Sequence, residues 1–181
     1  MKEIEAQCRK IFEDERKLHI RKYPDWKLGH GLAYIRCRDD DNLFSFKQQI
    51  KVIFNQAINQ SEKDRCHYFI HDYYLDLNCS ANDLNRSGLE LLKKRIQSTT
   101  KSCLFVTDFT RLYRNSSDRR SFTQFCQSNG CTIRIPGYPL DLNDPSTLFM
   151  LDMMTAIGEY ESEVTAARIR GSVHATLAAI E

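Results

Sequence analysis

The sequence predicts an α/β fold in which a mostly parallel sheet of four to five strands is flanked by helices. Short apolar runs rich in strand formers alternate with longer segments of helical periodicity, an order typical of parallel sheets covered on both faces. Hydrophobic residues make up 41% of the 181 residues, enough for a globular core. Finally, residues 146–181 contain no proline and predict a helix too long for so small a domain to cover, so it should project.

The N-terminal region predicts a helix added to the main fold. Residues 1–22 carry a rough apolar stripe among dense charges, and Pro24 ends the pattern. The segment 25–31 contains Trp26 and two glycines, which indicate a connector. We therefore expect an extension and connector over residues 1–28, a main domain over 29–145 and a separate long helix over 146–181.

The main domain should alternate strands with helices. Strands are predicted at 32–37, 67–74, 103–106 and 131–135. Helices are predicted over about 45–60, from Arg86–Gly88 through Ile96, and from the cap at Asn115–Ser117 to Gly130. Polar loops are expected at 38–42 and 76–85, each at the carboxyl end of a strand.

Arginines gather at these strand ends. Arg111 and Arg114 follow the apolar strand Cys103–Val106, and the carboxyl edge is where open α/β sheets place their sites. The planar guanidinium group suits phosphate and other oxyanions. Arg36 lies inside an apolar strand, where an unpaired charge is costly, so it should meet a carboxylate or an anion. The pattern predicts a site for phosphate or another oxyanion at this edge.

Composition narrows the setting. The formal net charge is only +2, so nucleic-acid binding would have to come from clustered cations. The seven cysteines form no C-x-x-C pair and lie mostly in apolar segments, which indicates buried thiols in a reducing compartment. No apolar run reaches transmembrane length and no signal peptide is evident, so we expect a cytoplasmic protein. No metal and no small-molecule cofactor is predicted.

Five motifs between Ala33 and Gly171 resemble, in order, those of the serine recombinases, the family of resolvases and invertases. Each motif alone is weak, but their order and spacing together are specific. The matching stretches are Tyr34–Arg38, Ser45-x-x-x-Gln49, Cys79–Ala81 with Arg86–Leu89, Arg111–Asn115, and Ile157–Glu161 followed by Arg168.

The resemblance implies a resolvase-like domain whose long C-terminal helix mediates dimer or tetramer formation and contacts DNA. In this family a serine hydroxyl attacks a DNA phosphodiester without a metal, and arginines stabilise the charge that develops on the phosphate. The residues that it implies for catalysis are Arg36, Arg86, Arg111, Arg114 and Ser80. Those that it implies for DNA or phosphate binding are Arg38, Gln49, Arg168 and Arg170.

Arg38 occupies the place of the nucleophilic serine, and a guanidinium group cannot form the phosphoester. Three functions therefore stay open. The chain could exchange DNA strands through a replacement nucleophile, for which the candidates are Ser80, Ser45 and Cys37. It could be an inactive module that binds DNA or a recombinase. It could also be a metal-dependent phosphoryl hydrolase that uses Asp39 and Asp41.

A second departure concerns the carboxylate that precedes the first arginine of the Arg111–Asn115 motif. Thr110 stands at this place. Asp108 lies two residues earlier, on the same side of an extended strand, and could partly replace the missing carboxylate.

Overall fold

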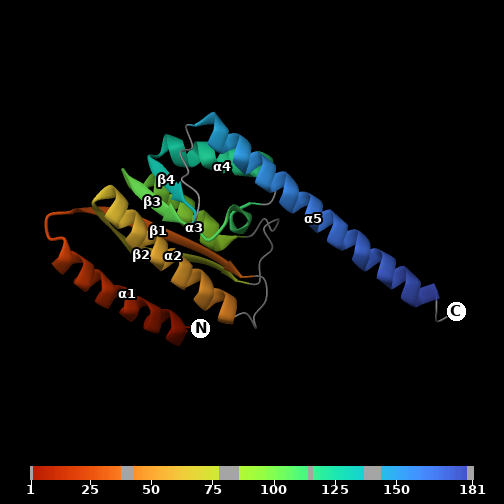
Figure 1. Cartoon of the computed structure of the whole chain (residues 1–181), viewed down its shortest axis with the longest axis horizontal. Coiled ribbons are helices and arrows are strands. Elements are labelled where there is room, and N and C mark those ends of the chain that lie inside the picture. Colours follow the sequence, from red (N-terminus) through yellow and green to blue (C-terminus); the bar gives the residue numbers. More distant parts are fainter. Residues whose placement is uncertain (1, 38–42, 78–85, 114–115, 137–143, 179–181) are drawn as a thin grey trace.

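The computed structural model describes residues 2–37, 43–77, 86–113, 116–136 and 144–178 (Figure 1). All strand pairs of the sheet are parallel, in the order β2-β1-β3-β4. The elements are α1 (Lys2–Lys22), β1 (Lys27–Cys37), α2 (Leu43–Asp64), β2 (Cys66–Leu77), α3 (Ser87–Gln97), β3 (Ser102–Phe105), the 3-10 turn η1 (Phe109–Arg111), α4 (Ser116–Ser128), β4 (Cys131–Arg134) and α5 (Pro145–Ala178). This arrangement confirms the predicted α/β fold.

The first strand begins earlier than the sequence predicts. β1 starts at Lys27, within the segment expected to be a connector, and pairs with β2 along its whole length. Gly29 and Gly31, which indicated a connector, instead allow residues of β2 to approach the backbone of β1 closely. A Cβ atom on Gly31 would lie 2.8 Å from the carbonyl oxygen of Phe69, so only glycine fits there without a backbone shift.

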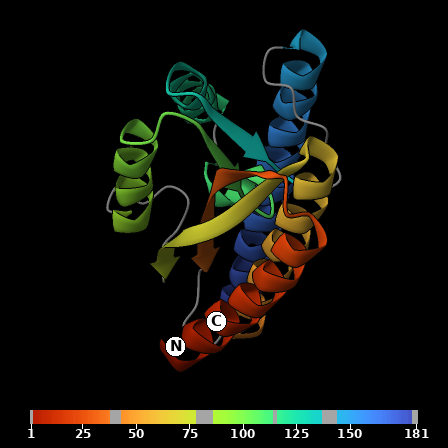
Figure 2. The same ribbon diagram turned by 90° about the vertical axis from the view of Figure 1, so that its left-hand side faces the viewer.

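Alternate residues of β1 feed two separate cores. Ala33 and Ile35 pack with α2 on one face of the sheet, whereas Leu32 and Tyr34 pack with α3 and α4 on the other. Figure 2 shows α3 and α4 on one side of the sheet and α2 on the opposite side. Because successive side chains of a strand point to opposite faces, a central strand covered on both faces is mostly apolar.

The second strand is also longer than expected. β2 runs to Leu77, so Asp76 belongs to the strand and not to the predicted polar loop. Asp76 is only 2% exposed. It lies beside the first turn of α3, where Gly88 allows the helix to approach: a Cβ atom there would lie 2.5 Å from the carbonyl oxygen of Leu75.

The long C-terminal helix is anchored at its first turns and then leaves the domain. Asp144 caps α5 by accepting hydrogen bonds from the backbone N–H groups of Ser146 and Thr147, at 3.2 and 3.0 Å. Asp152 then accepts hydrogen bonds from both Arg119 and Arg120 of α4. Beyond this joint the helix extends away from the sheet (Figure 1), as predicted. None of the described helices has the length and apolar character needed to span a membrane.

Candidate functional site

The site begins at the carboxyl ends of the neighbouring strands β1 and β3, where β1 continues beyond the last residue of β3. Arg36, near the end of β1, is 3% exposed and donates from Nε to the carbonyl oxygen of Arg111 at 3.0 Å. Its Nη2 donates to the carbonyl oxygen of Thr110, also at 3.0 Å. Both carbonyls belong to η1, the turn that follows β3. A guanidinium group on one strand thus fixes the turn at the end of its neighbour.

Arg86 holds the same turn from the other side. Its side chain is 4% exposed, and Nη2 donates to the carbonyl oxygen of Arg111 at 2.9 Å. Nη1 donates to the carbonyl oxygen of Leu112, while Nε and Nη2 lie 3.2 and 2.5 Å from the hydroxyl oxygen of Tyr34. Two buried arginines therefore meet at one peptide carbonyl, that of Arg111.

A buried carboxylate balances this positive charge. Asp76 accepts a hydrogen bond from the Tyr34 hydroxyl at 2.7 Å and lies 3.7 Å from Nε of Arg86. It also accepts hydrogen bonds from the backbone N–H groups of Gly88 and Leu89, at 2.7 and 3.0 Å, and so serves the N-terminus of α3. Burial raises the pKa of Tyr34 far above its ordinary value, so the hydroxyl keeps its proton and can donate.

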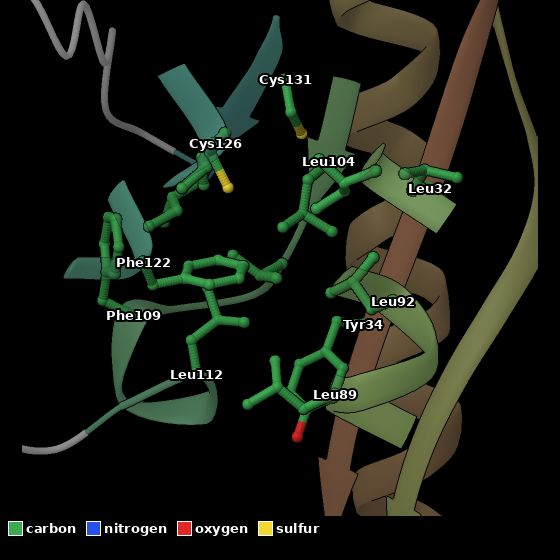
Figure 3. Close-up of a cluster of buried hydrophobic side chains, with 14 of the residues drawn as sticks. Leu32, Tyr34, Leu89, Leu92, Leu104, Phe109, Leu112, Phe122, Cys126 and Cys131 are labelled. Carbon is green, nitrogen blue, oxygen red and sulfur yellow. The ribbon is translucent and has the colours of Figure 1, made fainter. Parts of the chain in front are cut away.

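The Tyr34 side chain connects the hydrophobic core to the arginine cluster: its ring packs in the core and its hydroxyl group contacts Asp76 and Arg86. Figure 3 shows its ring among Leu89, Leu92 and Leu112, with the hydroxyl at the end of the cluster. The guanidinium carbon of Arg86 lies 5.4 Å from the centre of the Tyr34 ring and 5.4 Å from that of Tyr113. These contacts lock the orientation of Arg86 with packing as well as hydrogen bonds.

Arg111 is the most accessible of the three arginines described here. Its side chain is 32% exposed, and Nε pairs with Oδ2 of Asp108 at 3.2 Å. Asp108 also accepts from the backbone N–H of Arg111 at 3.2 Å and from the Thr110 hydroxyl. Nη1 of Arg111 lies 3.4 Å from the carbonyl oxygen of Arg36. Asp108 thus forms an ion pair with Arg111, at the motif in which Thr110 stands in place of the expected carboxylate.

Gln49 is brought to the same strand end from α2. It is 4% exposed, and its Nε2 donates to the carbonyl oxygen of Arg36 at 3.2 Å and approaches Sγ of Cys37 at 3.5 Å. Gln49 therefore holds the end of β1 in place.

The structure locates the other predicted residues less closely or not at all. Arg38, Ser80 and Arg114 lie outside the described residues, as do Asp39 and Asp41. Ser45 is in α2, but its side chain is not described. Arg168 and Arg170 are exposed on the projecting part of α5. Within the described parts of the chain, no group of three His, Cys, Asp or Glu side chains could hold a metal ion.

Sequence reasoning missed three contributors to this site: Tyr34, Asp76 and Tyr113. Tyr34 was visible only as part of a motif. Asp76 lies two residues after Tyr74, and this alternation could have placed it on the α3 face of a strand. The sequence instead predicts a polar loop over 76–85. Nothing in the sequence indicated that Tyr113 would pack against Arg86.

The family comparison matches most of the chain. The model described as "Resolvase, N terminal domain" covers residues 32–179. The chain belongs to the resolvase family. This membership supports a role in DNA recombination. None of the curated proteins compared with this resolvase-family chain matches it.

A solved structure of an integrase domain supports the same fold. The N-terminal catalytic domain of TP901-1 integrase is 20% identical, with a TM-score of 0.53, and the alignment covers 75% of this chain and 98% of that one. A resolvase family site-specific recombinase from Streptococcus pneumoniae is 18% identical, with a TM-score of 0.49, over 84% of this chain and 99% of the other. At such identities the integrase domain establishes the resolvase-like α/β fold and no more.

Proposed function

We propose that this resolvase-family chain acts in DNA recombination by binding DNA phosphate and pairing with a second copy, and that it does not itself form a phosphoserine link. In this proposal residues 29–145 hold the phosphate site, and residues 146–181 form the pairing helix. The observation that carries the proposal is the convergence of Arg36, Arg86 and Arg111 on one turn, next to a strand whose following residue is Arg38 instead of serine.

Charge and exposure favour phosphate as the ligand. Among the described residues, Asp76 pairs with Arg86 and Asp108 pairs with Arg111, so the guanidinium groups are held in fixed positions by carboxylates. Arg36 and Arg86 donate hydrogen bonds to carbonyl oxygens of η1, so they fix the position of Arg111 in this turn. Their positive charges also lie close to Arg111. Arg111 is the group that a DNA phosphate can reach from solvent.

The chain carries no nucleophilic side chain at position 38, where the resemblance to serine recombinases places the reactive serine. A guanidinium at position 38 can bind a phosphate but cannot attack it. The structure describes neither Ser80 nor the side chain of Ser45, so neither receives support as a replacement. The metal-dependent alternative receives no support either, because Asp39 and Asp41 also lie outside the described residues.

A second copy of the chain fits the exposed stripe on α5. Phe149, Met153 and Ile157 follow one another at four-residue spacing and are 66%, 52% and 53% exposed. Met154 and Tyr160 extend the stripe at 42% and 68% exposure. A contiguous apolar face of this kind on a projecting helix is typical of a helix-pairing surface.

The experiment measures binding to duplex DNA at increasing salt for the wild type and for Arg111→Ala. We expect weaker binding by the variant and a salt slope smaller by about one, because one phosphate contact is lost. Lys101→Ala is the control, since Lys101 is exposed at the opposite, amino end of β3 and should leave the slope unchanged. Equal affinity and slope for Arg111→Ala and the wild type would refute the proposed site.

A further inference from the structure

The N-terminal helix lies outside the stretch that matches the family model, residues 32–179, and is attached to the edge strand β2. Its described contacts with β2 come from its last two turns and the residue that follows. The guanidinium carbon of Arg16 lies 4.0 Å from the centre of the Phe69 ring. The two histidines His19 and His67 face each other, with their Nδ1 atoms 3.0 Å apart. Among the described side chains of α1, Arg16 and His19 therefore link the end of the helix to β2.

The contact of His67 with Tyr23 determines which ring nitrogen of His67 carries a hydrogen when the ring is neutral. His67 is 1% exposed, and its Nε2 lies 2.8 Å from the carbonyl oxygen of Tyr23. Because a carbonyl oxygen only accepts, Nε2 must carry the hydrogen. Neutral His67 then has a lone pair on Nδ1, and this lone pair points at His19.

The form of His19 follows from that of His67. Its Nδ1 must carry a hydrogen in order to donate to the Nδ1 lone pair of His67. The remaining nitrogen, Nε2 of His19, is buried and has no hydrogen-bond partner. The neutral pair satisfies the contact between the two rings with a single hydrogen, and only in this arrangement of tautomers.

Added protons conflict with this arrangement. One proton on the pair would place an N–H of His19 at the buried Nε2 position, which has no hydrogen-bond partner among the described residues. A second proton would set two N–H groups against each other across 3.0 Å, with like charges on both rings. Either proton therefore favours separation of α1 from β2.

We propose that the His19–His67 pair is a pH-sensitive latch that holds α1 against β2 at neutral pH and releases it on acidification. The proposal concerns α1 alone and does not depend on the phosphate site. The histidine pair lies in an aromatic cluster. Trp26 stacks on Tyr23 with 3.9 Å between ring centres, and its ring centre lies 5.5 Å from that of each histidine.

The charged groups around the pair do not reverse the effect. Among the described side chains, these are Arg16 and Lys22 on α1 and Glu62 on α2, which lies 3.7 Å from Nζ of Lys22. Burial is the largest cause that lowers the pKa of His19, followed by His67; Glu62 raises this pKa and Lys22 lowers it. On β2, burial raises the pKa of the neighbouring Cys66 thiol, so this group stays neutral in acid.

The direction of the pH dependence follows from the lowered pKa. A histidine whose pKa is lower in the docked state stabilises docking at pH values above its ordinary pKa of about 6.5, and this contribution is lost as the pH falls. The ratio of released to docked helix should rise about tenfold per pH unit for each proton that the pair takes up. We therefore expect weaker docking of α1 in acid than at neutral pH.

Trp26 is the chain's single tryptophan and reports on the latch directly. The experiment follows Trp26 emission from pH 8 to pH 5 alongside amide hydrogen exchange of residues 16–23 and 66–69. We expect emission to shift as Trp26 gains solvent, and exchange in both segments to accelerate over the same pH range. Exchange rates are compared after correction for the intrinsic effect of pH, and the circular dichroism of the sheet should stay constant.

Two variants separate the latch from other titrations. His19→Gln keeps a hydrogen-bond donor but cannot be protonated, so its Trp26 emission should stay nearly constant between pH 8 and pH 5. His30→Gln is the matched control, because His30 is exposed on β1, and it should titrate like the wild type. The proposal fails if His19→Gln titrates like the wild type. It also fails if Trp26 emission changes while hydrogen exchange in residues 16–23 stays constant, which would indicate quenching without release.

Discussion

At the scale of single residues, Arg86 carries the largest share of the site's organisation. It is buried, donates to two backbone carbonyls and to Tyr34, and lies 3.7 Å from the carboxylate of Asp76. Removing its side chain leaves buried acceptors without a donor and leaves Asp76 as a buried charge without its counter-charge.

Arg86→Ala should therefore lower the free energy of unfolding by about 3–5 kcal/mol. Arg95→Ala is the matched control, because Arg95 also pairs with an aspartate, Asp72, but both side chains are more than 40% exposed. An exposed pair contributes about 0–1 kcal/mol. Urea denaturation of the two variants measures the difference, and equal losses would contradict the structural role of Arg86.

The residue scale also shows what the sequence could predict of the site. The pattern of strand ends predicted Arg111 at this edge, the charge inside an apolar strand singled out Arg36, and the family resemblance added Arg86. The structure brings all three side chains to the same turn. The sequence could not predict that Arg36 and Arg86 would bind carbonyls of η1, because those acceptors are backbone atoms that any sequence provides. Asp76 escaped prediction because its partners, Tyr34 and the N-terminus of α3, are distant in sequence.

At the scale of elements, α5 combines a fixed beginning with an open face. Asp152 binds Arg119, which is 1% exposed, and Arg120, which is 69% exposed, so the start of the helix is tied to α4. Beyond this joint its large apolar side chains are exposed. The joint sets the direction in which the apolar stripe leaves the domain, and so the face that a second copy would meet.

Ile157→Glu should therefore shift the chain towards the monomer in sedimentation experiments, because the glutamate places a charge in the centre of the pairing surface. Leu91→Glu is the control: Leu91 is 56% exposed, similar to the 53% of Ile157, but lies on α3. It should leave the association state unchanged. A wild type that remains monomeric at high concentration would contradict pairing through α5.

Element boundaries were the least predictable part of the fold. The order of helices and strands followed from apolar periodicity, yet β1 begins at Lys27 and β2 runs to Leu77, both beyond the predicted limits. In β1 the glycines that usually break strands fit a close approach of β2, and at the end of β2 a buried Asp76 replaces the expected loop. Tertiary contacts decided both cases, and local sequence patterns do not contain them.

At the scale of the whole molecule, a resolvase-like domain carries an organised cluster of arginines, a projecting apolar helix and an added N-terminal helix. The cluster supplies the charge that a phosphate requires, and α5 offers a surface for a partner. The serine that would start the family's reaction is replaced by Arg38. Together these features support the proposal that the protein holds DNA in a recombination assembly and leaves strand cleavage to others.

The most direct test of this account is to incubate the chain with supercoiled DNA, denature the mixture and look for protein covalently attached to DNA. An active serine recombinase treated in parallel shows that the assay detects such adducts. The account predicts DNA binding before denaturation and no covalent adduct afterwards, because a guanidinium cannot form a phosphoester. A robust adduct that disappears in Ser80→Ala or Ser45→Ala would contradict it and would identify the replacement nucleophile.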